Sequence, residues 1–450
     1  MATIQDKAAA PIGAAAGRAA PKARLITPLL WTFLTAMVLA NIGGSMFYPL
    51  LPLYLRELNA GVSEIGLFFT LSMIVPLALQ IAGGWISDHI GRLRSVAIGS
   101  IGGALGWVGI LLAPTWGWLL VGQAIGSVAR AFVAPSFDAF IAEQSDEKNR
   151  GTVFAVSQTI FQVVSVAGPL LGGYAVKAFG WRGLIWIAAM FYFAATAIRL
   201  VMARKAASGS AQTKPLNARS FGQSFKSIIG LALSGGVVTW LILSDGVRDI
   251  AMGLSGNLLP VFLTEERGID IGTIGLLNAL LGGASMLVMI PAGKLADRFG
   301  ERFAIAAGYG TAFLAFALML LVPSPWAAGA AFIVFGMAIG MLQPAYQSLI
   351  SKAVPEKLRG IAFGFLSTSN GIVALPAPWL GAMLWKGIAP AAPFWVTTMA
   401  MLLIVPPVLA KFKLPAKATG TEPVSDEVPL AERAAEATAL ELAAETASAR

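Results

Sequence analysis

The sequence contains no cysteine and a single histidine, His89. A chain without cysteine forms no disulfide, and one histidine cannot supply a histidine-based metal site or a catalytic triad. The sequence also lacks the G-x-x-x-x-G-K-[ST] loop that cradles the phosphates of ATP. We therefore expect neither an enzyme nor a bound cofactor or metal, and we do not expect ATP to drive the protein.

Charge is scarce as well: only 12% of the 450 residues are charged, whereas 57% are hydrophobic. A soluble protein of this length needs far more charge to cover its surface, so long apolar runs indicate contact with lipid. The formal net charge of +9 does not require nucleic acid, because Lys and Arg collect on the cytoplasmic face of membrane proteins. These features predict a multi-pass protein of the cell inner membrane.

Apolar stretches long enough for a membrane-spanning helix, about 20 residues each, recur along the chain. We expect twelve spans, at residues 27–51, 65–87, 95–113, 118–142, 152–176, 183–203, 237–262, 272–294, 302–322, 326–350, 361–386 and 391–410.

The basic residues predict the orientation of these spans. If the N-terminus is cytoplasmic, 25 of the 32 Lys and Arg, Arg199 among them, fall in cytoplasmic segments, and five fall outside. This asymmetry follows the positive-inside rule and predicts that both termini are cytoplasmic. The expected organisation is a flexible N-terminal tail at 1–26, a six-helix domain at 27–203, a linker with an interfacial helix at 204–236, a second six-helix domain at 237–410 and an Ala/Glu-rich tail at 411–450.

The two halves are related by an internal repeat with an offset of 209 residues. Asp88 corresponds to Asp297, Pro169 to Pro378 and Gly172 to Gly381. Because each half has an even number of spans, the repeats are parallel, and such repeats place a cavity between them. The sequence therefore predicts an all-α membrane protein of two six-helix repeats around a central cavity.

The loop between the second and third spans reads GWISDHIGRLR, and its second copy reads GKLADRFGERF. This pattern resembles the loop signature of the major facilitator superfamily, with Glu301 in place of the Arg that occupies the equivalent position, Arg92. The resemblance implies that Asp88 contacts the start of the eleventh span, while Arg92 and Arg94 pair with Glu143. Such contacts would latch the halves on the cytoplasmic side; the alternative is that they only fix topology and loop folding. The expected latch residues are Gly84, Asp88, Gly91, Arg92, Arg94, Glu143, Gly293, Asp297, Arg298 and Gly300.

The fifth span contains a second motif, Gly168-Pro169-Leu-Leu-Gly172-Gly173. It resembles the signature of the drug–proton antiporter branch of the same family. Small residues and proline allow close helix approach and a bend, so we expect a tight helix contact that excludes water.

Ionisable residues deep within a span are costly and indicate function. Asp245, Arg248 and Asp249 share one helix face through their i, i+3, i+4 spacing. With a helix start near residue 237, Arg248 lies about 16 Å into the span, near the midplane. Two acids around one Arg can load and release a proton; the alternative is a permanent structural salt bridge.

Arg130 is the other charge in the interior, in the fourth span, and its repeat counterpart is the uncharged Ile339. It is a candidate for binding an anionic substrate group or for pairing with an acid in the cavity. Asp138 lies two turns farther on and is a candidate for either the cavity or the latch.

Polar residues at helical spacing complete the expected cavity, although each can instead be an interhelical hydrogen-bond partner. They are Asn41, which falls opposite Asp249 in the repeat, and Tyr48, Gln158, Gln162, Asn257, Gln343, Tyr346, Gln347 and Asn370.

Together these features predict a monomeric transporter with alternating access. The favoured interpretation is proton-coupled efflux of small amphipathic or drug-like molecules. One alternative is uptake or facilitated passage of a small metabolite, including an anionic one bound by Arg130 and Arg248. Another alternative is a membrane sensor that transports nothing.

Overall fold

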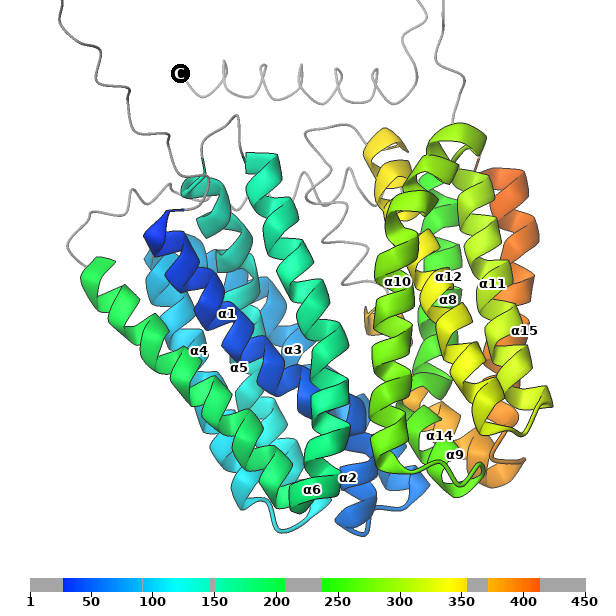
Figure 1. Ribbon diagram of the computed structural model, residues 1–450, viewed down its shortest axis with the longest axis horizontal. Helices are drawn as coiled ribbons and strands as arrows, with labels where there is room; N and C mark the ends of the chain where they lie inside the picture. Colours follow the sequence, from blue (N-terminus) through cyan, green and yellow to red (C-terminus); the bar gives the residue numbers. More distant parts are fainter. Residues whose placement is uncertain (1–26, 91, 146–149, 207–236, 354–370, 413–450) are drawn as a thin grey trace, which may run out of the picture. The chain divides into compact units, whose positions relative to one another are not determined.

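The computed structural model describes residues 27–90, 92–145, 150–206, 237–353 and 371–412, and these residues form helices joined by short turns, with no strand among them (Figure 1). The expected all-α class is therefore confirmed. The N-terminal tail, most of the 204–236 linker and the C-terminal tail lie outside the described residues.

The N-terminal half begins with α1 (Pro28–Phe47), followed by the short 3-10 helix η1 (Tyr48–Leu50) and α2 (Leu51–Glu57). Pro49 and Pro52 lie at the second positions of η1 and α2, in the first turn, where a missing N–H costs little. The remaining helices are α3 (Val62–Ile90), α4 (Arg92–Leu112), α5 (Trp116–Glu143) and α6 (Arg150–Ala206).

α6 covers both the fifth and the sixth predicted spans. It has 57 residues and would be about 85 Å long if straight, far more than one membrane crossing needs. Gly180, at φ 68°, interrupts it with a conformation that residues with a side chain rarely adopt. The helix therefore consists of two segments that meet at Gly180.

The C-terminal half has α8 (Val237–Ser255), η2 (Gly256–Leu258), α9 (Leu259–Glu265), α10 (Ile271–Phe299), α11 (Glu301–Leu321), α12 (Pro325–Ala353), α14 (Ala377–Gly387) and α15 (Ala392–Lys411). Only the second part of the predicted span at 361–386 lies within the described residues. Eight helical stretches in the described chain are long and apolar enough to cross a membrane.

Helix boundaries in the two halves match at the repeat offset. α3 and α10 both have 29 residues, α4 and α11 both have 21, and the starting residues of each pair differ by 209. The short helices η1 and α2 correspond to η2 and α9 at an offset of 208. Similar sequence features thus produce similar local structure twice along the chain.

Close glycine contacts join the two halves. The backbone of Gly275 in α10 is so close to α6 that an added Cβ would lie 2.5 Å from the carbonyl oxygen of Pro169 and 3.0 Å from Cα of Gly173. The repeat-related contact joins α3 to α14, where a Cβ on Gly66 would lie 2.6 Å from the carbonyl oxygen of Pro378. The Gly-Pro motif of the fifth span therefore belongs to a contact between the halves, which only small residues permit.

An ion pair within each half explains the unusual Glu301. Nε of Arg92 in α4 lies 3.2 Å from Oε1 of Glu143 in α5. At the positions 209 residues later, the signs are exchanged: Glu301 in α11 pairs with Lys352 in α12 and accepts a hydrogen bond of 2.8 Å from Ser348. Glu301 thus preserves the interaction that the motif makes.

Replacement of Gly275 by Ala is expected to destabilise the contact between α10 and α6, because the new methyl group meets backbone atoms that cannot rotate away. Overpacking of this kind costs about 1–3 kcal/mol. A methyl group added to Gly283, in the same helix, would have no neighbouring atom within 4 Å, so Gly283→Ala is the matched control. Thermal melting of both purified variants and transport assays in vesicles should show a lower melting temperature and less transport for Gly275→Ala alone. Equal melting temperatures would contradict the close contact.

The Glu301→Lys substitution is expected to place a second cation beside Lys352. The side chain of Glu301 is only 8% exposed, so this charge would be buried. We expect the free energy of unfolding to fall by about 2 kcal/mol, because the buried charge at position 301 has no partner of opposite sign, whereas Lys352 remains partly solvated. The double variant Glu301→Lys/Lys352→Glu should recover most of this loss. Thermal melting measures the recovery, and a double variant as unstable as the single one would argue against a direct pair.

Candidate functional site

A charged cluster lies in the middle of α8. Nη1 of Arg248 is 2.7 Å from Oδ1 of Asp245, and its Nε and Nη2 donate to Oδ1 of Asp249 at 3.0 and 2.9 Å. The i, i+3, i+4 spacing thus brings the three residues together as the sequence indicates. With both carboxylates ionised, the cluster carries one net negative charge.

Two tyrosines extend this cluster toward neighbouring helices. The guanidinium of Arg248 lies 5.5 Å from the ring centroid of Tyr346 in α12, a cation–π distance. The hydroxyl of Tyr346 is 2.7 Å from that of Tyr309 in α11. Tyr309 is fully buried and was not among the predicted site residues, because a lone Tyr in an apolar span carries no spacing signal.

The two acids of the cluster differ in their surroundings. The side chain of Asp245 is 9% exposed and that of Asp249 is 31% exposed. Although Oδ1 of Asp245 is close to Arg248, the atom accepts no hydrogen bond of acceptable geometry. A buried charge without good hydrogen bonds is costly, so Asp245 is the harder of the two to keep ionised.

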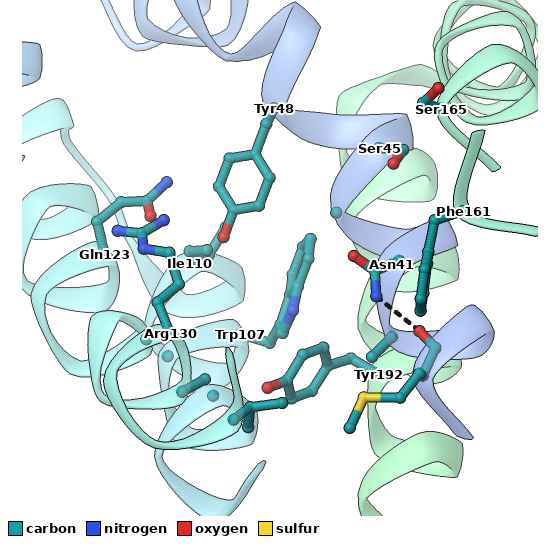
Figure 2. A pocket seen from close by; sticks show the side chains of 18 of the residues that line it. Asn41, Ser45, Tyr48, Trp107, Ile110, Gln123, Arg130, Phe161, Ser165 and Tyr192 are labelled. Atoms are coloured by element: carbon teal, nitrogen blue, oxygen red, sulfur yellow. Dashed lines mark hydrogen bonds between the residues drawn. The ribbon is translucent and has the colours of Figure 1, made fainter. Parts of the chain in front are cut away.

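A cavity of about 780 Å³ opens within the N-terminal half (Figure 2). Its lining comes from α1, η1, α4, α5 and α6, and it includes the predicted residues Asn41, Tyr48, Arg130 and Gln158. The sequence places the cavity between the halves, whereas none of the lining residues of this cavity belongs to the C-terminal half. Some of the predicted cavity residues therefore lie around this cavity, and others lie in the cluster of Arg248.

The cavity has a polar corner and an aromatic wall. In the polar corner, the guanidinium of Arg130, the amide of Gln123 and the hydroxyl of Tyr48 lie on one side of the cavity (Figure 2). The aromatic wall consists of Trp107, Tyr192 and Phe161, with the rings of Trp107 and Tyr192 centred 6.4 Å apart. This combination of apolar surface with a few polar groups is typical of small-molecule sites.

Arg130 is exposed to the cavity and makes no hydrogen bond or ion pair with the described residues. Asn41, by contrast, donates its amide to the carbonyl oxygen of Met37 at 2.8 Å, which leaves its own side-chain oxygen free. Arg130 is thus a cation available to a ligand.

Arg199, counted in a cytoplasmic segment from the sequence, also lines the cavity and is 3% exposed, so its side chain lies inside the helix bundle. Its guanidinium donates to Oγ of Ser100 at 3.0 Å, to the carbonyl oxygen of Ala36 at 3.3 Å and to Sδ of Met37 at 2.9 Å. These acceptors, contributed by α1 and α4, allow the charge to lie inside. No carboxylate of the described residues pairs with it.

The charge of the polar corner decides which ligands it favours. Two like charges 5 Å apart repel by about 3 kcal/mol at an effective dielectric constant of about 20. A cation–π contact with the aromatic wall offers about 0.5–2 kcal/mol. A cationic ligand beside Arg130 would therefore be disfavoured despite the aromatic rings.

The other predicted residues lie elsewhere. Gln162 donates to the carbonyl oxygen of Gly282 at 3.4 Å and so bridges the halves. Asn257 is in η2, while Gln343 and Gln347 are exposed on α12. Asn370, Gly91 and the side chains of Asp88 and Asp138 lie outside what the structure describes. Gly84 is in α3 and Gly293 in α10.

The second copy of the loop motif and the fifth-span motif are better defined. Asp297 and Arg298 are exposed at the end of α10, which Gly300 terminates with φ 89°. Gly168 packs on Ser45, and Gly172 packs on the backbone of Met46. Arg94, at the start of α4, is exposed.

Several proteins of known function are similar to this chain over most of its length. It is 26% identical to the multidrug resistance protein MdtG of Enterobacter lignolyticus, over 81% of this chain and 87% of the relative. It is 26% identical to the class C tetracycline resistance protein of Escherichia coli, over 85% of this chain and 96% of that protein. The multi-drug resistance efflux pump PmrA of Streptococcus pneumoniae is 23% identical, over 79% of this chain and 89% of the pump.

Solved structures share the fold. A bacterial homologue of the iron transporter ferroportin, in its inward-facing state, superposes with a TM-score of 0.69 at 15% identity, covering 85% of this chain and 98% of the homologue. A bacterial homologue of the lysosomal transporter Spinster, also inward-facing, gives a TM-score of 0.66 at 15% identity, over 85% of this chain and 95% of the other.

The family model of the Major Facilitator Superfamily matches residues 33–378 and 241–442, which together span most of the chain. This match confirms the resemblance that the loop motif carries. The protein is an integral membrane transporter and not an enzyme: the chain belongs to the Major Facilitator Superfamily.

Proposed function

We propose that the protein is a proton-coupled antiporter that exports small amphipathic molecules by alternating access. The names of the relatives, which include multidrug and tetracycline resistance proteins, support efflux. The matched helix boundaries support a bundle of twelve spans in two six-helix repeats. The uneven distribution of Lys and Arg supports cytoplasmic termini.

The observation that carries proton coupling is the cluster of Asp245, Arg248 and Asp249 in α8. One proton converts its net charge from −1 to zero, and neutral groups are far cheaper inside a bilayer than charged ones. Such a cluster can therefore change its protonation state as its access to the two sides of the membrane alternates. A permanent salt bridge, in contrast, needs only one of the two acids.

Asp245 is the proposed proton carrier. It is the more buried acid, and its Oδ1 has no hydrogen bond of good geometry, so ionisation is least supported there. Asp249 makes two good hydrogen bonds with Arg248 and holds the guanidinium in place. Tyr346, stacked on Arg248, and Tyr309 restrict water around the cluster.

The proposed orientation places α2 and α9 at the outer face. There Arg56 and Glu265 form a bidentate ion pair between the halves, with Nε and Nη2 of Arg56 2.6 and 2.7 Å from the carboxylate oxygens. Nearby, Oγ1 of Thr70 in α3 accepts from the backbone N–H of Trp379 in α14 at 3.2 Å. Contacts that hold the outer ends together are those expected of an inward-facing state. On the opposite face, Asp88 is the proposed latch residue of the outward-facing state, whereas the Arg92–Glu143 pair lies within the N-terminal half and joins α4 to α5.

Asp245→Asn is expected to abolish proton release when purified protein binds a transported compound, because Asn carries no titratable proton. Asp249→Asn should retain at least part of the release. The measurement uses a pH indicator in weakly buffered detergent solution, and transport in vesicles with an imposed proton gradient is followed in parallel. Proton release that survives in Asp245→Asn and disappears in Asp249→Asn would reverse the two roles.

The Arg56→Glu substitution is expected to open the outer face, because two carboxylates would then repel each other between the halves. Labelling of cysteines introduced beside α2 and α9, in a chain with no native cysteine, should increase in Arg56→Glu. It should return to the original level in Arg56→Glu/Glu265→Arg. The native side chains of Arg56 and Glu265 are 32% and 38% exposed, so we expect the loss of this pair to lower the free energy of unfolding by only about 1 kcal/mol. Labelling that does not differ among the three proteins would exclude a latch at this pair.

A further inference from the structure

The cavity of the N-terminal half has an unbalanced charge. Among its described side chains are two guanidinium groups, those of Arg130 and Arg199, and no carboxylate. The interior Arg of the C-terminal half, Arg248, is instead held between two acids. The two halves therefore treat an interior cation in opposite ways.

The scaffold does not account for Arg130. It forms no hydrogen bond or ion pair with any described residue, and its repeat counterpart is Ile339. Asp138 follows it by eight residues in α5, about 12 Å along the helix axis, and its side chain lies outside what the structure describes. An unpaired charge within a membrane-spanning segment is expensive, so a ligand is the natural source of its counter-charge.

The polar corner is suited to an anion. The guanidinium of Arg130 can donate two parallel hydrogen bonds to a carboxylate, and Gln123 and Tyr48, on the same side of the cavity, are further donors (Figure 2). Arg199 also lines the cavity; its hydrogen-bond acceptors are neutral, and its Nε has no partner among the described residues. Its uncompensated charge makes the whole cavity more favourable for anions.

The aromatic wall defines the rest of the ligand. Trp107, Tyr192 and Phe161 offer flat apolar surface, and a cavity of about 780 Å³ is within the size range of sites for drug-sized molecules. An inorganic anion or a sugar acid would leave this surface without a partner.

We propose that this cavity selects amphipathic monoanions: molecules with an aromatic body, which packs on the aromatic wall, and one acidic group, which binds Arg130 in the polar corner. This assignment rests on the proposed efflux function and specifies its substrate class. Arg130 is then a specificity-determining residue, while proton exchange takes place separately in α8.

Binding to the detergent-solubilised full chain tests this assignment directly. The probes are 2-naphthoate, its methyl ester and 2-naphthylmethylammonium, which share one ring system and differ in charge; equilibrium dialysis measures their affinities. We expect naphthoate to bind at least about tenfold more tightly than the other two, the usual effect of a charge-assisted hydrogen bond. Arg130→Gln should remove this preference and Arg130→Lys should retain part of it. Arg204→Gln, the same change at an exposed position of α6 outside the cavity, should have no effect.

Vesicle transport supplies an independent measurement. With one proton imported per cycle, export of a monoanion moves two unit charges across the membrane and export of a neutral ester moves one. The limiting gradient is the ratio of probe concentrations across the membrane at which net transport stops. A membrane potential of about 59 mV changes it about tenfold per charge moved. The same potential should therefore change the limiting gradient of naphthoate about 100-fold and that of the ester about tenfold.

The outcomes separate this assignment from the proposed function. Equal or weaker binding of naphthoate relative to the ammonium probe would overturn the anion assignment; if the ester still releases protons and Asp245→Asn abolishes that release, proton-coupled transport stands. A naphthoate preference that persists unchanged in Arg130→Gln would also overturn it. A preference lost in Arg130→Gln supports the assignment even if no probe releases protons, in which case proton coupling fails instead.

Discussion

The cost of placing charge within a bilayer is the constraint on which the rest of this structure depends. In a chain with 12% charged residues, each interior charge needs a local means of compensation. Arg248 has two carboxylates and an aromatic face, and Arg199 has a hydroxyl, a carbonyl oxygen and a thioether. Among the described residues, Arg130 has neither an acid nor a hydrogen-bond acceptor as a partner, which is why its environment indicates a binding site rather than a structural one.

A second constraint follows from the proposed alternating access, in which the halves form close contacts and also separate again. Apolar side chains gain little by leaving lipid for one another, so close backbone approach supplies the interaction. The pairs Gly66–Pro378 and Gly275–Pro169 provide it at repeat-related positions. The Arg56–Glu265 pair joins two residues separated by the repeat offset itself. Such contacts depend on geometry rather than on a large buried area, and they are suited to being broken and formed in each cycle.

Much of this arrangement follows from sequence patterns that operate over short distances. Hydropathy located most helices, the i, i+3, i+4 spacing brought Asp245, Arg248 and Asp249 together, and the loop motif indicated the family. The burial of Arg199 could not be inferred, because its acceptors come from α1 and α4, which are distant in sequence. Glu301 departs from the loop motif, and the partner that explains it, Lys352, is 51 residues away in the sequence. Compensation between distant residues is visible in three dimensions and not in the pattern of one segment.

In the proposed antiport mechanism, the separation of Arg130 from the α8 cluster has a consequence. An anion in the N-terminal cavity and a proton in the C-terminal cluster have opposite charges, so neither can compete directly for the other's site. Exchange between them must then be enforced through conformation: loading of each half has to alter the stability of the contacts that close the outer or the cytoplasmic face. A ligand changes such an equilibrium only through different affinities for the two states. The contacts of α6 with α10 and of α3 with α14 join the two halves. Pro169 takes part in one of these contacts, because it both lines the cavity and contacts Gly275. In the proposed orientation, that shared residue connects the cavity physically to the closure of the outer face.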